Sequence, residues 1–163
     1  MDVLAARVGG ALKAHGYMLA TAESCTGGGV AQAVTAIAGS SAWFDRGFVT
    51  YSNLAKQQML GVTEASLIAY GAVSEAVVRE MALGALRNGA AQVSLAVSGI
   101  AGPGGGTPEK PVGTVWFAWA QDNGNVVVAR HLFQGNRDEV RAQSVRTALR
   151  GLLDLLGQST LLA

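Results

Sequence analysis

The chain has 163 residues, 50% of them hydrophobic and 14% charged, and its 12 basic and 11 acidic side chains leave a formal charge of +1. This length is typical of one domain, and the nearly neutral charge argues against nucleic acid as the main partner. The N-terminal residues lack the basic and apolar regions of a signal peptide, and no apolar run approaches the roughly 18 residues of a membrane span. We therefore expect a single cytoplasmic domain over residues 1–163 that does not contact a membrane.

The first part of the chain alternates helical and strand-like patterns around a glycine-rich turn. Apolar residues at helical spacing predict an opening helix over residues 3–15, which Gly16 ends. We expect a strand over residues 17–23 to follow. The turn over residues 24–29 then leads into a helix that should end near Gly39, because glycine allows a sharp change of direction at little steric cost.

The next segment predicts one strand and two helices. β-Branched and aromatic side chains favour a strand over residues 46–52. We expect Asn53 to cap the helix that follows and Gly61 to end it. Ser74 should cap a longer helix that Gly89 closes.

Three strands and a long glycine-rich loop are predicted next. A buried strand over residues 93–98 precedes residues 99–111, which hold five glycines and three prolines and are too long for a hairpin turn. We interpret this segment as a functional loop. Strands over residues 112–120 and 126–133 flank an Asn123-Gly124 pair, which is typical of an antiparallel hairpin.

Asn136 and Glu139 form a capping-box pattern that opens a final helix through about Leu156. Strands and helices that alternate in this order favour an α/β fold, a three-layer α/β/α sandwich with a mixed β-sheet. Ligands of such folds bind at the loops beyond the strand ends.

Histidine and cysteine chemistry has few candidates in this chain. His15 lies near the end of the first predicted helix and His131 in a strand of the hairpin, and neither is well placed for a serine triad. Cys25 is the single cysteine, so an internal disulfide is excluded and no zinc cluster is predicted. If the chain carries a nucleophile, its base is not expected to be a histidine.

Ser24 is the first candidate nucleophile. It stands where a strand ends and a glycine turn leads to a helix N-terminus, so we expect unpaired backbone N–H groups beside its hydroxyl, as in an oxyanion hole. The structural alternative is that Ser24 or Thr26 only caps the helix. Cys25 is a rival nucleophile, although adjacent residues at a turn point in different directions.

Lys56 is the candidate base. Counted from Asn53 as the cap, it occupies the third helical position, where the helix dipole disfavours the ammonium form. Burial would lower its pKa further, so a neutral Lys56 could accept a proton. The alternative is a solvated surface lysine. A turn of chain can bring the Tyr51 hydroxyl near Lys56, although Tyr51 alone would be interpreted as a core residue.

Arg137 is a candidate ligand for an anion. It follows Asn136 at a helix start, where a guanidinium and free N–H groups suit a phosphate or carboxylate. The alternative is an exposed arginine. The glycine-rich loop has no Gly-Lys-Ser/Thr ending, so it is not a P-loop.

Several segments, in order along nearly the whole chain, closely resemble the C-terminal domain of CinA, the competence/damage-inducible protein. Stand-alone versions of that domain are PncC nicotinamide-nucleotide amidohydrolases. The matching segments are Thr21-Ala-Glu-Ser-Cys-Thr-Gly-Gly28, Gly39-Ser-Ser-Ala-Trp-Phe44, Gly47-Phe-Val-Thr-Tyr-Ser-Asn53 with Lys56, Gly71-Ala-Val-Ser-Glu75, Ser98-Gly-Ile-Ala-Gly-Pro103 and Lys110-Pro-Val-Gly-Thr114.

The resemblance implies an NMN deamidase, which hydrolyses nicotinamide mononucleotide to nicotinate mononucleotide and ammonia in pyridine nucleotide salvage. It also implies a homo-oligomer, commonly a dimer, that needs no metal or cofactor. The nucleophile carries to Ser24 and its partners to Lys56 and Tyr51. Ser98 and Arg137 are further implied site residues.

The backbone around Thr26 and Gly27, or around Ser98 and Gly99, is expected to hold the oxyanion. Two positions depart from the family pattern: Gly29 replaces a bulkier apolar residue and Ser98 replaces a threonine, and either could alter the pocket. The rival hypothesis is a non-catalytic nucleotide-binding or interaction domain linked to competence or DNA damage.

Overall fold

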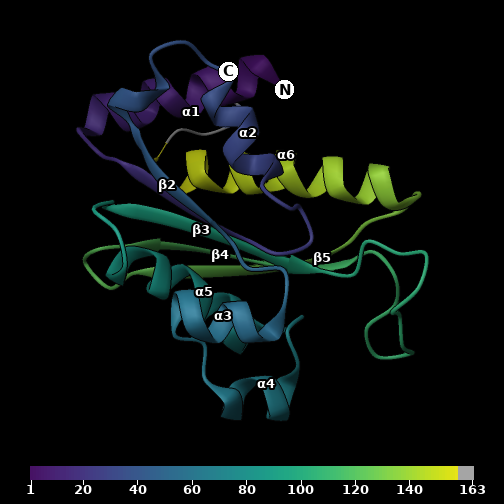
Figure 1. Cartoon of the computed structure of the whole chain (residues 1–163). Helices are drawn as coiled ribbons and strands as arrows, with labels where there is room; N and C mark the ends of the chain where they lie inside the picture. The colour runs from purple at the N-terminus through teal and green to yellow at the C-terminus, as the bar shows by residue number, and fades with distance from the viewer. Residues whose placement is uncertain (158–163) are drawn as a thin grey trace.

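The computed structural model describes residues 1–157. Its helices and strands alternate along the chain (Figure 1). In order they are α1 (Asp2–His15), β1 (Leu19–Glu23), α2 (Gly29–Thr35), the short 3₁₀ helix η1 (Ser40–Ala42), β2 (Phe44–Val49), α3 (Asn53–Leu60), α4 (Glu64–Tyr70), α5 (Glu75–Arg87), β3 (Val93–Gly99), β4 (Thr114–Gln121), β5 (Val126–Leu132) and α6 (Arg137–Leu155).

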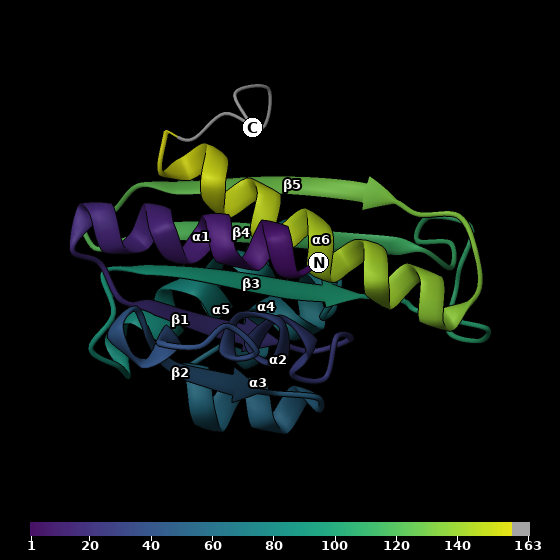
Figure 2. The same ribbon diagram turned by 90° about the horizontal axis from the view of Figure 1, so that it is seen from above.

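The five strands form one open mixed sheet in the order β2-β1-β3-β4-β5. β1 runs parallel to both β2 and β3, whereas β3, β4 and β5 pair antiparallel. Helices α1, α2 and α6 cover one face and α3, α4 and α5 lie on the other (Figure 1). Seen from above, α1 and α6 lie side by side over the sheet (Figure 2). The predicted three-layer α/β/α fold is confirmed.

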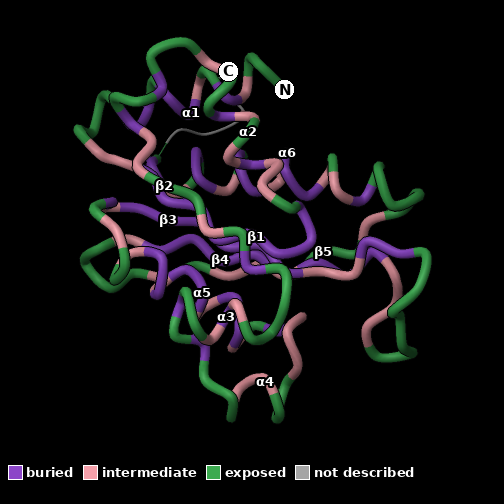
Figure 3. Tube along the Cα trace, viewed as in Figure 1, coloured by how far each residue is buried: buried purple, intermediate pink, exposed green. Residues whose placement is uncertain are grey.

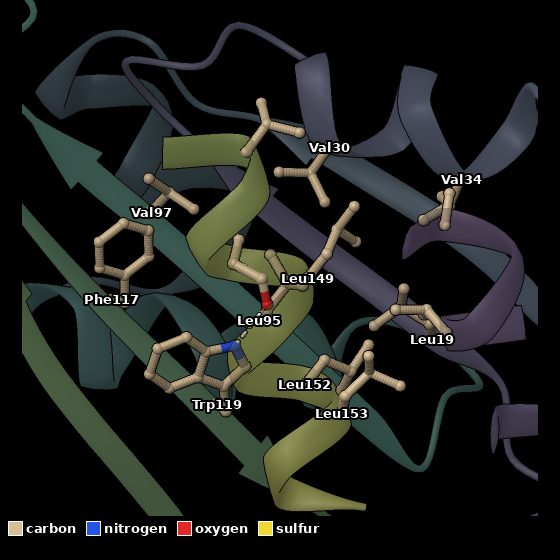
Figure 4. Close-up of a cluster of buried hydrophobic side chains, with 14 of the residues drawn as sticks. Leu19, Val30, Val34, Leu95, Val97, Phe117, Trp119, Leu149, Leu152 and Leu153 are labelled. Carbon is tan, nitrogen blue, oxygen red and sulfur yellow. Dashed lines mark hydrogen bonds between the residues drawn. The ribbon is translucent and has the colours of Figure 1, made fainter. Parts of the chain in front are cut away.

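The sheet separates two hydrophobic clusters, and its central strands β1, β3 and β4 are the most continuously buried part of the chain (Figure 3). The face under α6 carries large side chains, such as Leu95, Phe117 and Trp119, which pack with Leu149 and Leu152 (Figure 4). Burial of each such side chain stabilises the fold by about 1.5–3 kcal/mol.

The opposite face of the sheet is built differently. It presents small residues, among them Ala22, Ala96 and Ala118, to the apolar face of α5. Side chains alternate between the two faces of a strand, so large and small residues alternate along β3, and Phe117 and Trp119 of β4 alternate with Ala118 and Ala120. α5 therefore approaches the sheet closely, and Met81 fills the space between them.

Most predicted elements are confirmed, with shifts at their ends. Gly16 ends α1 in the left-handed conformation, and the Asn136–Glu139 capping box opens α6. α2 ends at Thr35 rather than near Gly39, and Gly39, in the left-handed conformation, is instead the N-cap of η1.

The region between β2 and α5 differs more from the sequence expectation. β2 is Phe44–Val49 rather than 46–52, and Ser52, not Asn53, caps α3, because its hydroxyl accepts the Ala55 N–H at 3.0 Å. Lys56 is therefore the fourth helical residue, not the third. Helix α4 was not predicted: none of its residues is buried, so its sequence lacks the apolar periodicity of a packed helix.

The carboxyl ends of the parallel strands β1, β2 and β3 meet at one edge of the sheet. Ser24 follows β1, Thr50 follows β2 and Ser98 is the second-to-last residue of β3. The start of α6 reaches the same edge, because Arg137 contacts residues that follow β2 and β3.

Candidate active site

Lys56 and Ser24 lie in direct contact. The side chain of Lys56 is only 1% exposed, and its Nζ lies 3.1 Å from Ser24 Oγ and donates to the Thr50 carbonyl at 3.0 Å. Two strand ends and one helix meet at this point, since Ser24 follows β1, Thr50 follows β2 and Lys56 belongs to α3. Lys56 is therefore not a solvated surface lysine.

The surroundings of Lys56 favour its neutral form. Burial lowers the pKa of the Lys56 ammonium below its usual value, and the nearby Cys25 opposes this shift. Within residues 1–157, no carboxylate lies within ion-pair distance of Nζ. A neutral amine at this position can accept the proton of Ser24 Oγ–H.

The turn after β1 is closed by its own backbone. Ser24 N–H donates to Val97 O at 3.0 Å, and Gly27 N–H donates to Ser24 O at 3.0 Å. Gly27 and Gly28 have φ values of 58° and 97°, which L side chains adopt at a cost. Because its N–H is used within the turn, Gly27 does not offer the oxyanion donor that the sequence predicts there.

The start of α2 does not use Ser24 or Thr26 as its cap. Gly28 is the N-cap residue, and the buried Glu23 carboxylate instead accepts Thr26 Oγ1 at 2.6 Å and the N–H groups of Val30 and Ala31 at 2.8 and 3.0 Å. The first amides of α2 are thus occupied, and they do not face the Ser24 hydroxyl as expected from the sequence. Ser24 Oγ therefore takes no part in capping α2, and it contacts Lys56 Nζ instead.

Cys25 is a poor rival to Ser24. Its side chain is 6% exposed, and burial raises the pKa of the thiol to about 11. A thiol with this pKa stays protonated near neutral pH, whereas nucleophilic attack requires the thiolate.

Tyr51 and Arg137 meet at the rim of the site. Arg137 Nη2 donates to the Tyr51 hydroxyl at 2.9 Å, and its Nη1 donates to Gly102 O at 2.8 Å. Tyr51 is 60% exposed, so it is not a core residue, and in the described part of the chain its hydroxyl makes no hydrogen bond to Lys56. Arg137 therefore joins the segment after β2 to the glycine-rich loop after β3.

These groups line a cavity of about 310 Å³. A volume near the lower end of the range for small-molecule sites suits a compact ligand. The cavity is bounded by Ser24, Cys25, Tyr51, Asn53, Lys56, Ala72, Val73, Ser98, Gly99, Ile100, Ala101, Gly102, Gly104, Gly105 and Arg137. The predicted residues Thr26 and Gly27 are not among them, and the Thr26 side chain is directed to the Glu23 carboxylate instead.

Within residues 1–157, no three histidine, cysteine, aspartate or glutamate side chains gather closely enough to hold an ion. A search of the same residues for a helix long and apolar enough to cross a membrane finds none.

A family model described as the CinA C-terminal domain matches residues 1–156. The chain belongs to this family. The resemblance inferred from the sequence motifs is thereby confirmed.

Two curated relatives of this CinA-family chain are named nicotinamide-nucleotide amidohydrolase PncC. The protein from Enterobacter agglomerans is 60% identical over 151 residues, which cover 90% of this chain and 92% of the relative. The protein from Escherichia coli (strain K12) is 57% identical over 157 residues, which cover 96% of this chain and 95% of the relative.

A solved structure shares the fold. The crystal structure of the competence/damage inducible protein CihA from Agrobacterium tumefaciens matches this CinA-family chain with a TM-score of 0.92 at 50% sequence identity. The match covers 96% of this chain and 95% of that chain.

The two departures from the CinA family pattern lie in different places. Ser98 is 1% exposed and lines the cavity, so it can affect the pocket as expected. Gly29 lies between α2 and α6, where a Cβ atom would approach Val145 Cγ2 to 3.0 Å. Gly29 sets the distance between these helices and does not line the cavity, so the expectation that it shapes the pocket is wrong.

Two residues of the site were missed by sequence reasoning. Glu23 is a buried carboxylate in the last position of a strand, and that unusual place for a charge was an available signal. Arg141, on α6, donates to the Cys25 and Thr26 carbonyls. No signal in the sequence identified Arg141, because it lies 115 residues from Thr26 and only folding brings the two together.

Proposed function

We propose that this chain hydrolyses the carboxamide of nicotinamide mononucleotide to nicotinate mononucleotide and ammonia. The single observation that carries the proposal is the contact of the buried Lys56 Nζ with Ser24 Oγ at 3.1 Å, inside a cavity suited to a small molecule. The names of the two PncC relatives, both more than half identical over most of the chain, supply the substrate. The reaction belongs to pyridine nucleotide salvage.

The first half of the reaction forms an acyl-enzyme. Neutral Lys56 Nζ takes the proton of the Ser24 hydroxyl while Oγ bonds to the carboxamide carbon, and the carbonyl electron pair moves onto oxygen. When the carbonyl forms again, the C–N bond breaks and the Lys56 ammonium gives its proton to the departing nitrogen. Ammonia leaves, and the nicotinoyl group remains as an ester on Ser24.

The second half uses the same base. Water gives a proton to Lys56 Nζ as its oxygen attacks the ester carbon, and a second tetrahedral oxyanion forms. Collapse of this intermediate breaks the bond to Ser24 Oγ, which takes its proton back from Lys56. Nicotinate mononucleotide is released, and both side chains return to their starting states.

Arg137 is the proposed contact for the phosphate of the nucleotide. Its guanidinium lies at the cavity rim, with two of its N–H groups held by Tyr51 and Gly102, and the remaining donors are suited to phosphate oxygens. Tyr51 holds Arg137 in place and flanks the ligand. The glycines of residues 99–106 let the backbone approach the ribose closely.

An ammonia-release assay tests this function. Nicotinamide mononucleotide should be hydrolysed and free nicotinamide should not, because only the nucleotide carries a phosphate for Arg137. Ser24→Ala and Lys56→Ala should both lose release of ammonia. Release of ammonia at near-parent rates in both variants would refute the mechanism. Binding of the nucleotide without any turnover by the parent would favour the alternative of a non-catalytic nucleotide-binding domain.

A further inference from the structure

The turn after Ser24 presents two amides that the protein leaves open. Within residues 1–157, no oxygen accepts a hydrogen bond from the N–H groups of Cys25 and Thr26, although the two residues are only 6% and 2% exposed. The Cys25 N–H meets only its own thiol, which is a weak acceptor. A buried N–H without a partner costs free energy, so such groups are rare outside functional sites. The amide of Gly27 is different, because it donates to Ser24 O.

Arg141 holds this turn from behind. It extends from α6, where Nε donates to Cys25 O at 3.1 Å and Nη2 donates to Thr26 O at 3.3 Å. No carboxylate lies within ion-pair distance of its guanidinium in the described part of the chain. Gly27 leaves room for it, since a Cβ atom there would lie 3.3 Å from Nη2. The hydrogen bonds of this half-buried guanidinium therefore go to two successive backbone carbonyls.

Peptide geometry links these contacts to the open amides. The C=O of one residue and the N–H of the next lie in one plane and point in opposite directions across a trans peptide. When Arg141 holds Cys25 O on the α6 side, the Thr26 N–H points away from α6. The preceding peptide is fixed in turn, because Gly27 N–H holds Ser24 O, and this sets the Cys25 N–H.

We infer that Arg141 is a positioning residue, which fixes the amides of Cys25 and Thr26 as the oxyanion donors of the Ser24 reaction. The inference rests on the proposed function, since the oxyanion forms only when Ser24 attacks a carbonyl carbon. The guanidinium also polarises the peptides that it holds, because a charge-assisted hydrogen bond to a carbonyl strengthens the N–H of the same amide as a donor. The positive charge thus acts on the oxyanion without contact.

The steady-state kinetics of Arg141→Met provide the first test. Methionine keeps an apolar stem and removes every donor, so kcat for nicotinamide mononucleotide should fall about 100-fold, as when an oxyanion donor is lost, while KM changes less than about twofold. Arg150→Met on the exposed side of the same helix is the matched control and should keep both constants. An unchanged kcat in folded Arg141→Met, or a raised KM at unchanged kcat, would overturn the inference.

Arg141→Lys extends the test if the methionine variant does not fold. Lysine keeps the charge but reaches one carbonyl at a time, so an intermediate loss of kcat, about tenfold, is expected. In Arg141→Ala, added guanidinium chloride should restore part of kcat, whereas sodium chloride at equal ionic strength should not. If guanidinium chloride restored no more kcat than sodium chloride does, the positioning role of Arg141 would be contradicted.

A substrate-independent probe separates this inference from the proposed function. A fluorophosphonate bonds to an activated serine oxygen with loss of fluoride, through an intermediate with a negatively charged oxygen. Ser24 labelling, followed by mass spectrometry, should be about as much slower in Arg141→Met as kcat is. If the parent is labelled but does not hydrolyse nicotinamide mononucleotide, the proposed substrate is wrong, and the labelling rates still test the role of Arg141. Equal labelling rates of parent and variant would refute the positioning role of Arg141 alone.

Discussion

Lys56→Met removes the proposed base and leaves the shape of the site nearly unchanged. Methionine fills most of the space of the lysine stem, which is buried to 1% exposure, but it has no Nζ to contact Ser24 and Thr50. General base catalysis contributes about 10²–10⁴ to a rate, so kcat for nicotinamide mononucleotide should fall by about 10³-fold. Binding of the nucleotide should change little, because Arg137 and the glycine-rich loop are untouched.

The same substitution has an opposite effect on stability, and its sign follows from the pKa of Lys56. Burial lowers this pKa in the folded state below the value of 10.5 of an exposed lysine. Between the lowered pKa and 10.5, the unfolded state binds more protons, so the parent's free energy of unfolding rises with pH. The rise from this group is at most about 1.4 kcal/mol per pH unit. Below the folded pKa, the buried ammonium is a constant penalty that methionine removes.

Denaturant unfolding of the parent and Lys56→Met at a series of pH values from neutral to alkaline measures this effect. The other titrating groups are common to both chains, so the difference between their two curves reports Lys56. The variant should be the more stable of the two below the folded pKa, with its advantage shrinking as pH rises. Parallel curves over the whole range would refute the lowered pKa, and with it the reason for assigning a neutral base.

Three further substitutions test the supports of the site. Glu23→Gln leaves at least one of three N–H or O–H donors of Thr26, Val30 and Ala31 unpaired, so the free energy of unfolding should fall by about 2 kcal/mol or more in urea titrations. Arg137→Met should raise KM for nicotinamide mononucleotide at least about tenfold and alter kcat/KM for nicotinamide riboside, which lacks the phosphate, far less. Gly27→Ala places a side chain at a φ of 58°, so unfolding should become easier by about 1 kcal/mol, measured by thermal melting, and kcat should fall.

Local signals in the sequence were sufficient for the elements that depend on neighbouring residues. The capping box at Asn136 and Glu139 and the left-handed Gly16 involve residues within one helical turn of each other, and both are present as predicted. Helix α4 escaped detection because its apolar side chains, such as Ile68 at 77% exposure, do not form a buried face.

The contacts that make the site lie far apart in sequence, and for these the local pattern was insufficient. The dipole argument for Lys56 assumed the wrong cap, yet the cause that lowers its pKa is burial, which depends on the contact of α3 with the residues that follow β1 and β2. The Tyr51 hydroxyl was expected near Lys56, but it pairs with Arg137, on a helix at the other end of the chain. Sequence spacing cannot distinguish these two partners, because both lie at the same edge of the sheet.

The arrangement of charges explains how a lysine can serve as the base in a site without a suitable histidine. Glu23 immediately precedes Ser24, and a carboxylate so close could have paired with Nζ and held the ammonium form. Instead, its oxygens accept Thr26 Oγ1 and the first amides of α2, on the far side of the turn from Lys56. The start of α2 thus occupies the Glu23 oxygens, and within residues 1–157 the buried Lys56 has no counterion. The same turn therefore positions Ser24 and keeps its base free to accept a proton.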